Sequence, residues 1–490
     1  MSGRLMNIYN LLPTQGRTIA AGLHGLYLRA WRYGPETDRL VELALERDRW
    51  TPKQWLAWRE ERLAYVLHRA ATRVPYYREH WQQRRLKGDH SSPELLENWP
   101  VLEKEPVHTN PRAFVADDCH PRRMFHEHTS GTTGKSLDLW WSLTTVRSWY
   151  ALFEARCRLW YGVSRHDRWA ILGGQLVTPV HQRKAPFWVW NGALNQLYCS
   201  TYHLAPAFIT AYLDALVRYR VRYLWGYTSA LYELAQVALE LKTHRFKLRV
   251  AITNAEPVFD YQRSTIERAF GCQVRETYGL AEIVAAASEC ESGNMHLWPE
   301  VGWVEIFDGQ HQVNGARSGE FICTGLLNAD MPLIRYRTGD SGALGGIKQC
   351  SCGRTLPVVR AIEGRVDDLL YAADGRRIGR LDPVFKSGLP VREAQIVQET
   401  LGQLRVRFVP TPEYTSEAGR SMIERLQARV GKMQIVLEPV ERVPRTRNGK
   451  FRAVVCKLPQ SNGHWGSNRE ANDTDAILPA GDRRTASSPV

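Results

Sequence analysis

The sequence predicts an α/β protein in which a large N-terminal domain is followed by a small, mobile C-terminal α+β domain. Three observations support this fold class. The chain has 490 residues, enough to bury a large core and to form more than one domain. Between about residues 100 and 345, short β-rich runs alternate with stretches of helical periodicity, as in a sheet covered by helices. After about residue 364, one alternating segment and one amphipathic segment indicate a separate α+β unit.

The first element with clear boundary signals is a helix that begins near residue 51. Thr51 supplies an N-cap hydroxyl, Pro52 takes the first helical position and Gln54 the third. The helix is expected to run toward residue 74. Further along, the β-rich runs 249–253 and 273–277 each lead into a loop. Loops at strand ends are where α/β proteins usually bind ligands.

Later elements follow from the same periodicities. A strand pair is expected at residues 319–325 and 332–336. In the small domain, apolar residues alternate over 404–408, which predicts a strand with one buried face. They recur at helical spacing over 423–430, and Gly431 is placed to end that helix.

Composition and charge restrict the class of protein. Hydrophobic residues make up 43% and charged residues 24%, which is ordinary for a globular protein and excludes global disorder. The net charge of +14 would suit an anionic partner such as a nucleotide, a nucleic acid or a membrane surface. The arginines are spread along the chain and form no stripe, so a basic solvated surface is expected and a nucleic-acid partner is not.

The N-terminal region contains an apolar stretch at residues 18–28. His24 interrupts it, Arg17 and Arg29 flank it, and it is far too short to span a bilayer. It is either a short interfacial helix or a buried terminal helix, and we expect burial. The nine cysteines are an odd number for a disulfide framework and suggest cytosolic thiols. We therefore predict a cytoplasmic protein without a transmembrane segment; the sequence does not indicate its oligomeric state.

Residues 128–136 read His-Thr-Ser-Gly-Thr-Thr-Gly-Lys-Ser and carry the most informative pattern. Glycines allow a tight turn that brings backbone N–H groups close to an anion, while hydroxyls and the lysine add donors and charge. This chemistry suits a polyphosphate, although such a loop can also be a plain flexible turn. The Walker pattern requires glycine at the position of Thr129, so that alternative fails.

Four motifs downstream strengthen the nucleotide hypothesis. Tyr278 and Gly279 can lie against a purine, and Glu282 can hold a metal ion that bridges phosphates. Asp340 ends an Arg-Tyr-Arg-Thr-Gly-Asp run and is expected on a turn, where it could accept hydrogen bonds from ribose hydroxyls. Residues 364–368 combine a glycine, a cation and paired acids where the composition changes. Residues 444–450 place Lys450 at the tip of a turn.

Together with the 128–136 loop, these motifs in this order resemble the adenylate-forming superfamily over roughly residues 50 to 457. Residues 252–257, the run 74–77 and the pair Cys350 and Cys352 resemble its phenylacetate–CoA ligase branch. That branch also contains deazaflavin-coenzyme adenylylating synthetases and CapK-like proteins.

The resemblance implies roles for individual residues. The ATP phosphates would be wrapped by Ser130, Gly131, Thr132, Thr133, Gly134 and Lys135. Adenine would lie along Asn254, Ala255 and Glu256 and stack on Tyr278, beside Gly279. Magnesium would be held by Glu282, the ribose hydroxyls by Asp340, and ribose or phosphate by Arg365. The catalytic set would be Lys450, Glu282 and Thr132, with Lys450 balancing the charge that builds at the α-phosphorus.

The resemblance also implies a domain division and shows one departure. An AMP-binding domain over 1–362, with a helical N-terminal segment, would be joined by a hinge at 363–368 to a lid domain over 369–458. Asp367 would be the hinge residue. The polar residues 459–490 are expected to form a disordered tail. Many relatives carry Ser or Thr where this chain has Ala281, so one hydroxyl contact to phosphate would be missing.

A zinc site is also readable from the sequence. Cys290, His296, Cys350 and Cys352 would supply three thiolates and one imidazole, a closed tetrahedral set of the structural kind. Similar Cys and His positions in the resembling branch favour this hypothesis. The Cys-x-Cys spacing is not among the commonest zinc pairings, and the alternative is a group of reduced thiols beside a histidine.

These expectations describe an ATP- and Mg²⁺-dependent, AMP-forming carboxylic acid ligase that passes its acyl group to coenzyme A. Three alternatives stay open: an adenylyltransferase, an amide-forming ligase that uses an amine acceptor, and a catalytically silent binding protein. The acid is not identified. Residues 225–229 and 173–174 would line its pocket, where the aromatic residues of 225–229 favour an aryl or apolar acid, but these rings could equally belong to the core.

Overall fold

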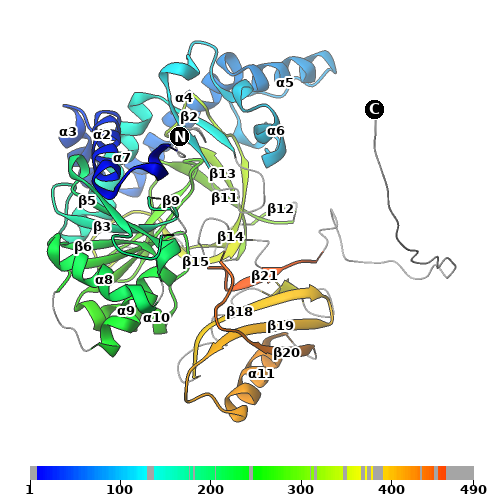
Figure 1. Ribbon diagram of the computed structural model, residues 1–490. Coiled ribbons are helices and arrows are strands. Elements are labelled where there is room, and N and C mark those ends of the chain that lie inside the picture. Colours follow the sequence, from blue (N-terminus) through cyan, green and yellow to red (C-terminus); the bar gives the residue numbers. More distant parts are fainter. Residues whose placement is uncertain are drawn as a thin grey trace, which may run out of the picture.

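The computed structural model describes most of the chain (Figure 1). The described residues are 8–129, 137–175, 177–179, 182–204, 206–241, 247–309, 311–313, 317–345, 350–365, 370–371, 377–378, 390–430, 433–445 and 451–458. Three predicted features lie outside them: the glycine-rich segment 130–136, the hinge residue Asp367 and the catalytic Lys450. The predicted tail 459–490 lies outside them too.

The large domain is built on one mixed sheet of the described residues, in the order β12-β11-β13-β14-β15-β10-β9-β8-β7-β6-β3-β5-β4. Its first strands are β3 (Trp169–Gly173), β4 (Trp188–Asn191), β5 (Gln196–Ser200), β6 (Tyr223–Tyr227), β7 (Val250–Asn254) and β8 (Gln273–Gly279). The remainder are β9 (Ala286–Glu289), β10 (Met295–Leu297), β11 (Gly302–Asp308), β12 (His311–Gln312), β13 (Gly319–Gly325), β14 (Tyr336–Leu344) and β15 (Val358–Arg365).

Strands β5, β3, β6, β7 and β8 run parallel. The central strands β6 and β7 are buried on both faces. In β6, Tyr223 and Trp225 belong to one hydrophobic core while Leu224 belongs to another. The second core is completed by α8 (Pro206–Arg218), α9 (Thr228–Glu240) and α10 (Asp260–Phe270), which lie together in Figure 1. Helix α7 (Leu143–Cys157) covers the first core. The predicted α/β class is confirmed.

Helices α2 (Thr14–Arg32), α3 (Thr37–Arg47), α4 (Pro52–Arg73), α5 (Pro75–Leu86) and α6 (Lys104–Thr109) form the N-terminal part. The predicted start of α4 is confirmed, because the Gln54 N–H donates to the Thr51 hydroxyl at 3.3 Å and the Gln54 side chain accepts from the Thr51 N–H at 2.9 Å. Short 3₁₀ turns are η1 (Leu96–Asn98), η2 (Pro111–Phe114), η3 (Pro121–Arg123), η4 (Leu159–Tyr161), η5 (Gly192–Leu194) and η6 (Thr201–His203).

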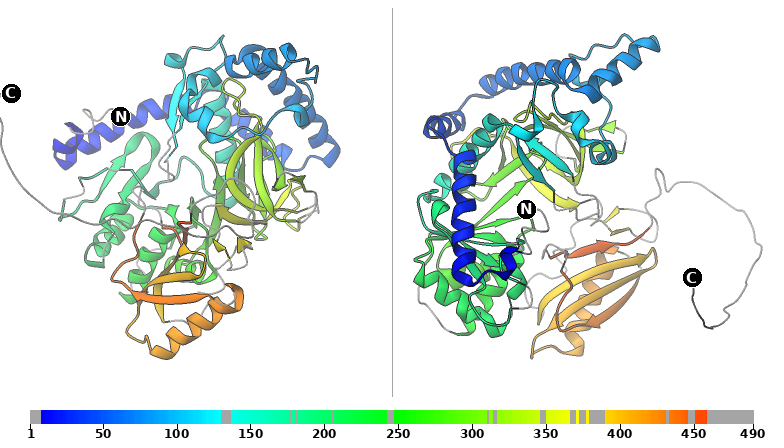
Figure 2. Two further views of the ribbon diagram at one scale, coloured as in Figure 1. Left: turned by 90° about the vertical axis from the view of Figure 1, so that its right-hand side faces the viewer. Right: turned by 45° about the horizontal axis from the view of Figure 1, so that its top comes forward.

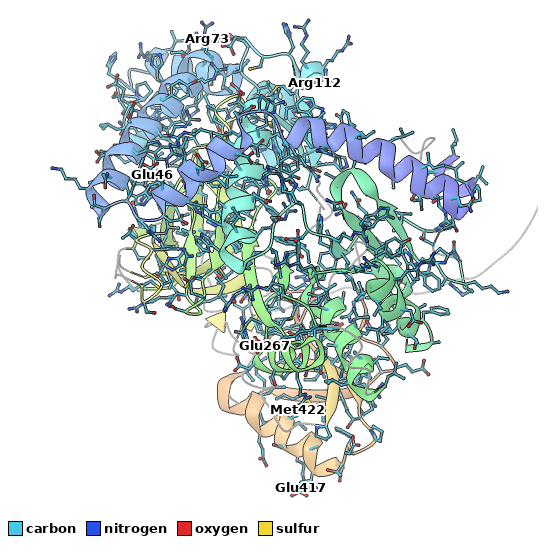
Figure 3. All side chains as sticks on the ribbon, turned by 90° about the vertical axis from the view of Figure 1, so that its left-hand side faces the viewer. Glu46, Arg73, Arg112, Glu267, Glu417 and Met422 are labelled. Atoms are coloured by element: carbon cyan, nitrogen blue, oxygen red, sulfur yellow. The ribbon has the colours of Figure 1, made fainter. Side chains whose placement is uncertain are left out.

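Helix α2 is less buried than the sequence suggested. It lies along the outside of the large domain (Figures 2 and 3). Gly25 packs so closely on β4 that an added Cβ would meet the Asn191 side chain at 1.9 Å. On the opposite face, Ile19, Leu23 and Leu26 are 65%, 64% and 56% exposed. The expectation of a buried helix is therefore wrong for this face. Within the described residues, no helix is both long and apolar enough to cross a bilayer.

One strand of the predicted pair was misplaced. Residues 319–325 form β13 as expected, but the second strand, β14, begins at Tyr336, where the prediction ended. Arg335 has a positive φ of 48°, which breaks the extended run before Tyr336. Its carbonyl instead accepts a hydrogen bond from the N–H of Leu102 at 2.9 Å, a partner that local periodicity could not reveal.

The small domain contains a four-stranded sheet in the order β20-β19-β18-β21, with α11 on one face (Figure 1). Its elements are β18 (Val391–Thr400), β19 (Gln403–Pro410), α11 (Ser416–Val430), β20 (Gln434–Pro439) and β21 (Val454–Cys456). The predicted strand over 404–408 and helix over 423–430 lie within β19 and α11. Two hairpins stand apart from the larger sheets: β1 (Phe125–His128) with β2 (Asp138–Trp141), and β16 (Leu370–Tyr371) with β17 (Arg377–Ile378).

Candidate functional site

The parallel strands bring three predicted site segments to one edge of the large sheet. The ends of β6, β7 and β8 lead into residues 227–229, 254–256 and 278–279. Because these strands are parallel neighbours, their carboxyl ends lie side by side. This is the edge at which open α/β sheets bind ligands.

Tyr278 and Asp340 meet at this edge although they are 62 residues apart. The Tyr278 hydroxyl donates a hydrogen bond of 2.7 Å to the Asp340 carboxylate. Burial, followed by the nearby negative charge of Asp340, raises the pKa of Tyr278 well above its usual value, so this hydroxyl keeps its proton. Asp340 is 7% exposed, and its backbone N–H donates to the Thr338 hydroxyl at 3.1 Å.

Asp340 does not lie on the turn that was expected. It sits inside β14 and pairs in register with Arg365 of β15. Gly339 just before it has φ 77°, a conformation that glycine adopts without strain. The motif therefore breaks a strand locally without ending it. The paired strands bring the backbones of two predicted nucleotide-binding residues, Asp340 and Arg365, next to each other.

Glu282 lies in the loop after β8 and is the predicted magnesium ligand. The hydroxyl of Tyr336 donates to its carboxylate at 3.2 Å. Tyr336 also begins β14, the strand that carries Asp340. One strand thus positions Asp340 directly and contacts Glu282 through a tyrosine, which was not among the predicted site residues.

Glu256 has a different environment from the one expected of an adenine contact. Its carboxylate accepts hydrogen bonds from the N–H and hydroxyl of Ser229 at 2.8 and 3.1 Å. It also accepts one of 2.6 Å from the backbone N–H of Phe451, in the small domain. Burial raises the pKa of Glu256, while these hydrogen bonds oppose the rise. Its neighbour Ala255 has φ 61°, a strained conformation for a residue with a Cβ.

The glycine-rich segment 130–136 is bracketed by described residues. The Thr129 N–H donates to the Leu137 carbonyl at 3.0 Å, and the Leu137 N–H donates to the Thr129 hydroxyl at 2.9 Å. These two bonds continue the β1–β2 pairing, which holds the ends of the segment together. The hydroxyl that replaces the Walker glycine therefore has a structural partner.

Only part of the region predicted to bind the acid opens into a cavity. Trp225 is 6% exposed and packs on Phe153 at a ring-centroid distance of 4.6 Å, so it belongs to the core. Gly173 has no room for a side chain, because an added Cβ would meet the Tyr198 hydroxyl at 2.6 Å. A cavity of about 250 Å³ opens beside Ser229. Its polar lining comes from both domains and includes Thr201, Tyr202, Glu233, Arg442 and Arg445.

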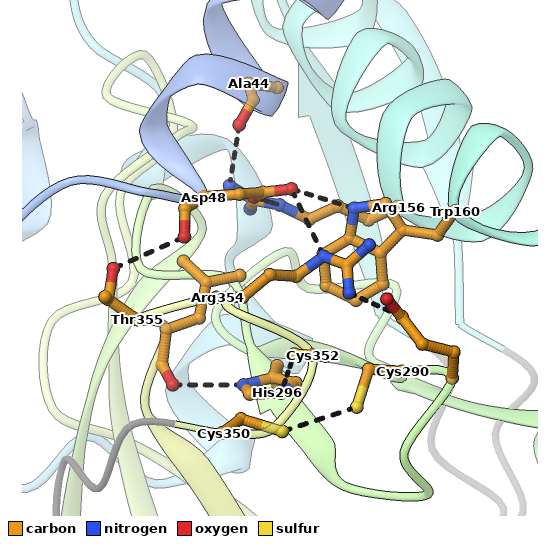
Figure 4. Close-up of polar contacts among 12 residues, drawn as sticks. Ala44, Asp48, Arg156, Trp160, Cys290, His296, Cys350, Cys352, Arg354 and Thr355 are labelled. Atoms are coloured by element: carbon orange, nitrogen blue, oxygen red, sulfur yellow. Dashed lines mark hydrogen bonds and ion pairs between the residues drawn. The ribbon is translucent and has the colours of Figure 1, made fainter.

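The predicted zinc ligands are brought together by the fold (Figure 4). The ligand atoms of Cys290, His296, Cys350 and Cys352 all lie within 4.8 Å of one another. The Cys290 and Cys350 sulfurs are 3.7 Å apart, and the Cys352 sulfur is 3.5 Å from His296 Nε2. His296 Nδ1 faces the Leu356 carbonyl at 3.0 Å. That contact fixes the proton on Nδ1 and turns the Nε2 lone pair toward the thiols.

The electrostatics of the cluster favour a thiolate at Cys350. Burial raises the pKa of this thiol, but hydrogen bonds from the Cys352 backbone and from the side chains of Cys352 and Asn294 are among the contacts that lower it to about 6. Burial raises the pKa values of Cys290 and Cys352, which share the pocket with that thiolate. A cation among the four ligands would offset this repulsion.

A buried ion network beside the cluster was not predicted from the sequence (Figure 4). Arg156 of α7 is fully buried and bonds Asp48 at 2.9 Å and Glu300 at 2.8 and 3.0 Å. Asp48, just after α3, accepts the Trp160 indole N–H at 2.8 Å, and its carbonyl accepts the Thr355 N–H at 3.0 Å. The network joins the N-terminal helices to the cysteine loop.

Known proteins are similar to this chain in sequence and in fold. Residues 370–457 match the family model described as the CapK C-terminal domain. Protein CapK of Staphylococcus aureus is 26% identical over 399 residues, which cover 78% of this chain and 85% of that protein. A phenylacetate–coenzyme A ligase of Pseudomonas putida is 26% identical over 327 residues, covering 63% of this chain and 70% of the ligase.

A solved structure extends the likeness in three dimensions. A 2-hydroxyisobutyryl-CoA ligase, crystallised in the postadenylation state, superposes with a TM-score of 0.63 at 20% identity. The superposition covers 81% of this chain and 89% of that one. At this identity the likeness concerns the fold.

Proposed function

On the premise that this chain is a relative of CapK and the phenylacetate–CoA ligases within the adenylate-forming superfamily, we propose that it is an AMP-forming carboxylic acid ligase. The first half-reaction would join a carboxylate oxygen to the α-phosphorus of ATP and release pyrophosphate. The second would transfer the acyl group to an acceptor and release AMP.

The observation that carries this proposal is the meeting of Tyr278 and Asp340, with Glu282 close by through Tyr336. A buried carboxylate anchored by a phenol is fixed in position and can accept hydrogen bonds from two ribose hydroxyls. The ring of Tyr278 would lie beside the base. Glu282 would hold Mg²⁺, which would neutralise charge on the phosphates as pyrophosphate leaves.

The contact between the two domains supports a role for Lys450 in the first half-reaction. Phe451, the residue after Lys450 in the chain, bonds Glu256 at the carboxyl edge of the sheet. We infer that the Glu256 carboxylate is a docking point for the small domain, and that adenine contacts come from the backbone of 254–256. The transfer step would require this bond to break, together with the ion pair of 3.9 Å between Arg392 and Glu240.

Coenzyme A is the proposed acceptor, supported by the likeness to phenylacetate–CoA ligases. An amine acceptor or no acceptor is the alternative. The cavity beside Ser229 is lined by polar side chains and also by Leu204, Ala230, Val443 and Pro444, so it would suit an acid with both polar and apolar parts. A cytoplasmic location, where ATP and coenzyme A are available, belongs to this proposal.

The test is acid-dependent exchange of labelled pyrophosphate into ATP, screened over aryl, fatty, hydroxylated and amino acids. At least one acid should support exchange, and product formation should then require coenzyme A. Thioester-independent turnover with an amine would move the assignment to an amide ligase. The absence of exchange with every acid would contradict the ligase proposal itself.

We also propose that the Cys/His cluster holds structural zinc. Tetrahedral zinc with its usual bond lengths requires sulfur–sulfur and sulfur–nitrogen separations of about 3.8 and 3.5 Å. The observed 3.7 and 3.5 Å fit this set. Four protein ligands leave no open position for water, so the metal would stabilise the fold. We expect about one zinc per chain after gel filtration, lost in Cys352→Ser; metal analysis of wild type finding none would refute the site.

A further inference from the structure

A second cavity, of about 350 Å³, lies at the edge of the sheet where the parallel strands begin, opposite the candidate nucleotide site. Its lining includes Trp169, the first residue of β3, and Asn195, the residue just before β5. The nucleotide site lies where the parallel strands end. The N-terminal helices close the other side of the cavity, through the last turn of α2 and the first residue of α3, Thr37.

The lining of this cavity is strongly cationic. It includes Arg29, Arg32, Arg158, Arg165 and His166. Arg158 is 3% exposed and donates to Glu154 at 2.9 Å. Arg165 bonds the exposed Asp38 at 2.6 Å and lies 3.7 Å from Glu154. Glu154 and Asp38 therefore form ion pairs with two of these arginines, Arg158 and Arg165.

The other two arginines, Arg29 and Arg32, have no ion pair within the part of the chain that the structure describes. The guanidinium of Arg32 lies 4.4 Å from the centre of the Tyr150 ring, and its Nε is buried without a hydrogen-bond partner among the described residues. Arg29 and His166 are exposed at the rim. Arg32 therefore brings to the cavity a positive charge that no carboxylate of the described residues balances, and an anionic ligand would offset it.

We propose that this cavity binds a small molecule that carries a phosphate monoester. Arg29 and Arg32, which have no ion pair among the described residues, match a dianion in charge, and guanidinium forks match phosphate oxygens in geometry. The imidazole of His166 adds a ring N–H that can donate to the phosphate. A volume of about 350 Å³ holds more than the phosphate, and the rings of Tyr33 and Trp169 supply surface for the body of the ligand.

Isothermal titration of the full chain with inorganic phosphate and with glucose 6-phosphate tests this site, and flotation with phosphatidic acid vesicles tests a lipid source. We expect one site for glucose 6-phosphate, tighter than for phosphate. The double variant Arg29→Gln/His166→Gln should weaken it at least about tenfold, as expected for losing charge-assisted hydrogen bonds. Arg32→Gln should weaken it similarly.

Two control variants distinguish this cavity from exposed cations elsewhere on the surface and from the predicted ATP loop. Arg39→Gln/His68→Gln removes the same charges from exposed positions outside the cavity and should bind normally. Lys135→Ala, in the predicted ATP loop, should also bind normally. Equal weakening in the surface control, loss in Lys135→Ala instead of the cavity variants, binding to vesicles alone, or no binding of either soluble probe would each overturn the proposal.

Discussion

The Cys/His cluster and the candidate nucleotide site differ in where their residues come from. All four cluster ligands belong to the large domain, and their ligand atoms already lie within 4.8 Å of one another. The nucleotide site combines a fixed half, made by Tyr278, Asp340 and Glu282, with contributions expected from residues 130–136 and from the small domain. A structural metal site gains from rigid ligands, whereas a site for two successive reactions needs a part that moves.

We expect the largest effect on stability from a substitution in the buried ion network beside the rigid Cys/His cluster. Arg156→Met would leave Asp48 and Glu300 buried with only the more distant cations of Arg354 and Arg47, at 3.8 and 4.0 Å. Removing one partner of a buried ion pair typically costs about 3–5 kcal/mol, and the free energy of unfolding should fall by that amount. Arg39→Met, at an exposed ion pair, is the control and should change it little. A loss below about 1 kcal/mol in Arg156→Met would show that the network is not a stabilising element.

In the small domain, which is expected to move, Lys450→Ala should slow acyl-adenylate formation by about 10²–10³-fold, as expected for one lost transition-state contact. It should spare transfer from chemically prepared acyl-AMP, because that step would use the other domain orientation. Rapid-quench assays of each half-reaction provide the measurement. Lys457→Ala, an exposed lysine paired with Glu399, is the matched control. Equal slowing of both half-reactions would make Lys450 a structural residue.

Glu276 and Glu289 lie between the two regions, on β8 and β9. Burial and then the charge of Glu289 raise the pKa of Glu276 from 4.5 to about 7. Because the folded state then holds a proton that the unfolded state releases, stability should fall as pH rises from about 4.5 to 7, by about 3 kcal/mol. Urea unfolding at both ends of this range should show a weaker pH dependence in Glu276→Gln, but not in the exposed control Glu417→Gln. An unchanged slope in Glu276→Gln would contradict the assignment.

The sequence predicted features that depend on residues close together in the chain and missed features that depend on distant residues. The start of α4 depends on residues three apart, Thr51 and Gln54, and local chemistry was enough. The start of β14 depends on Leu102, and the environment of Glu256 depends on Phe451, so neither followed from periodicity. A signal for the buried network did exist. Glu154, Arg156 and Arg158 are charged residues at the end of an apolar helix, and buried charges need partners.

The smallest effect concerns how Asp340 is held. Asp340→Asn would remove the charged acceptor for the ribose and should raise the KM for ATP by about tenfold to a hundredfold. Tyr278→Phe keeps the ring and removes only the hydrogen bond to Asp340, so a change of about tenfold or less is expected. Pyrophosphate-exchange kinetics against ATP concentration compare them. A larger effect for Tyr278→Phe than for Asp340→Asn would mean that the hydroxyl, and not the carboxylate, contacts the nucleotide.

Direct isolation of the acyl-adenylate tests whether this chain catalyses the first half-reaction. The wild-type chain would be mixed in single turnover with an acid identified by exchange, MgATP labelled at the α-phosphate, and no acceptor. After acid quench, mass spectrometry and the label should report enzyme-bound acyl-AMP in near-stoichiometric amount, and little in Lys450→Ala. Hydrolysis of ATP to AMP or ADP without an acyl-AMP species, at equal rates in both proteins, would contradict the proposed half-reaction.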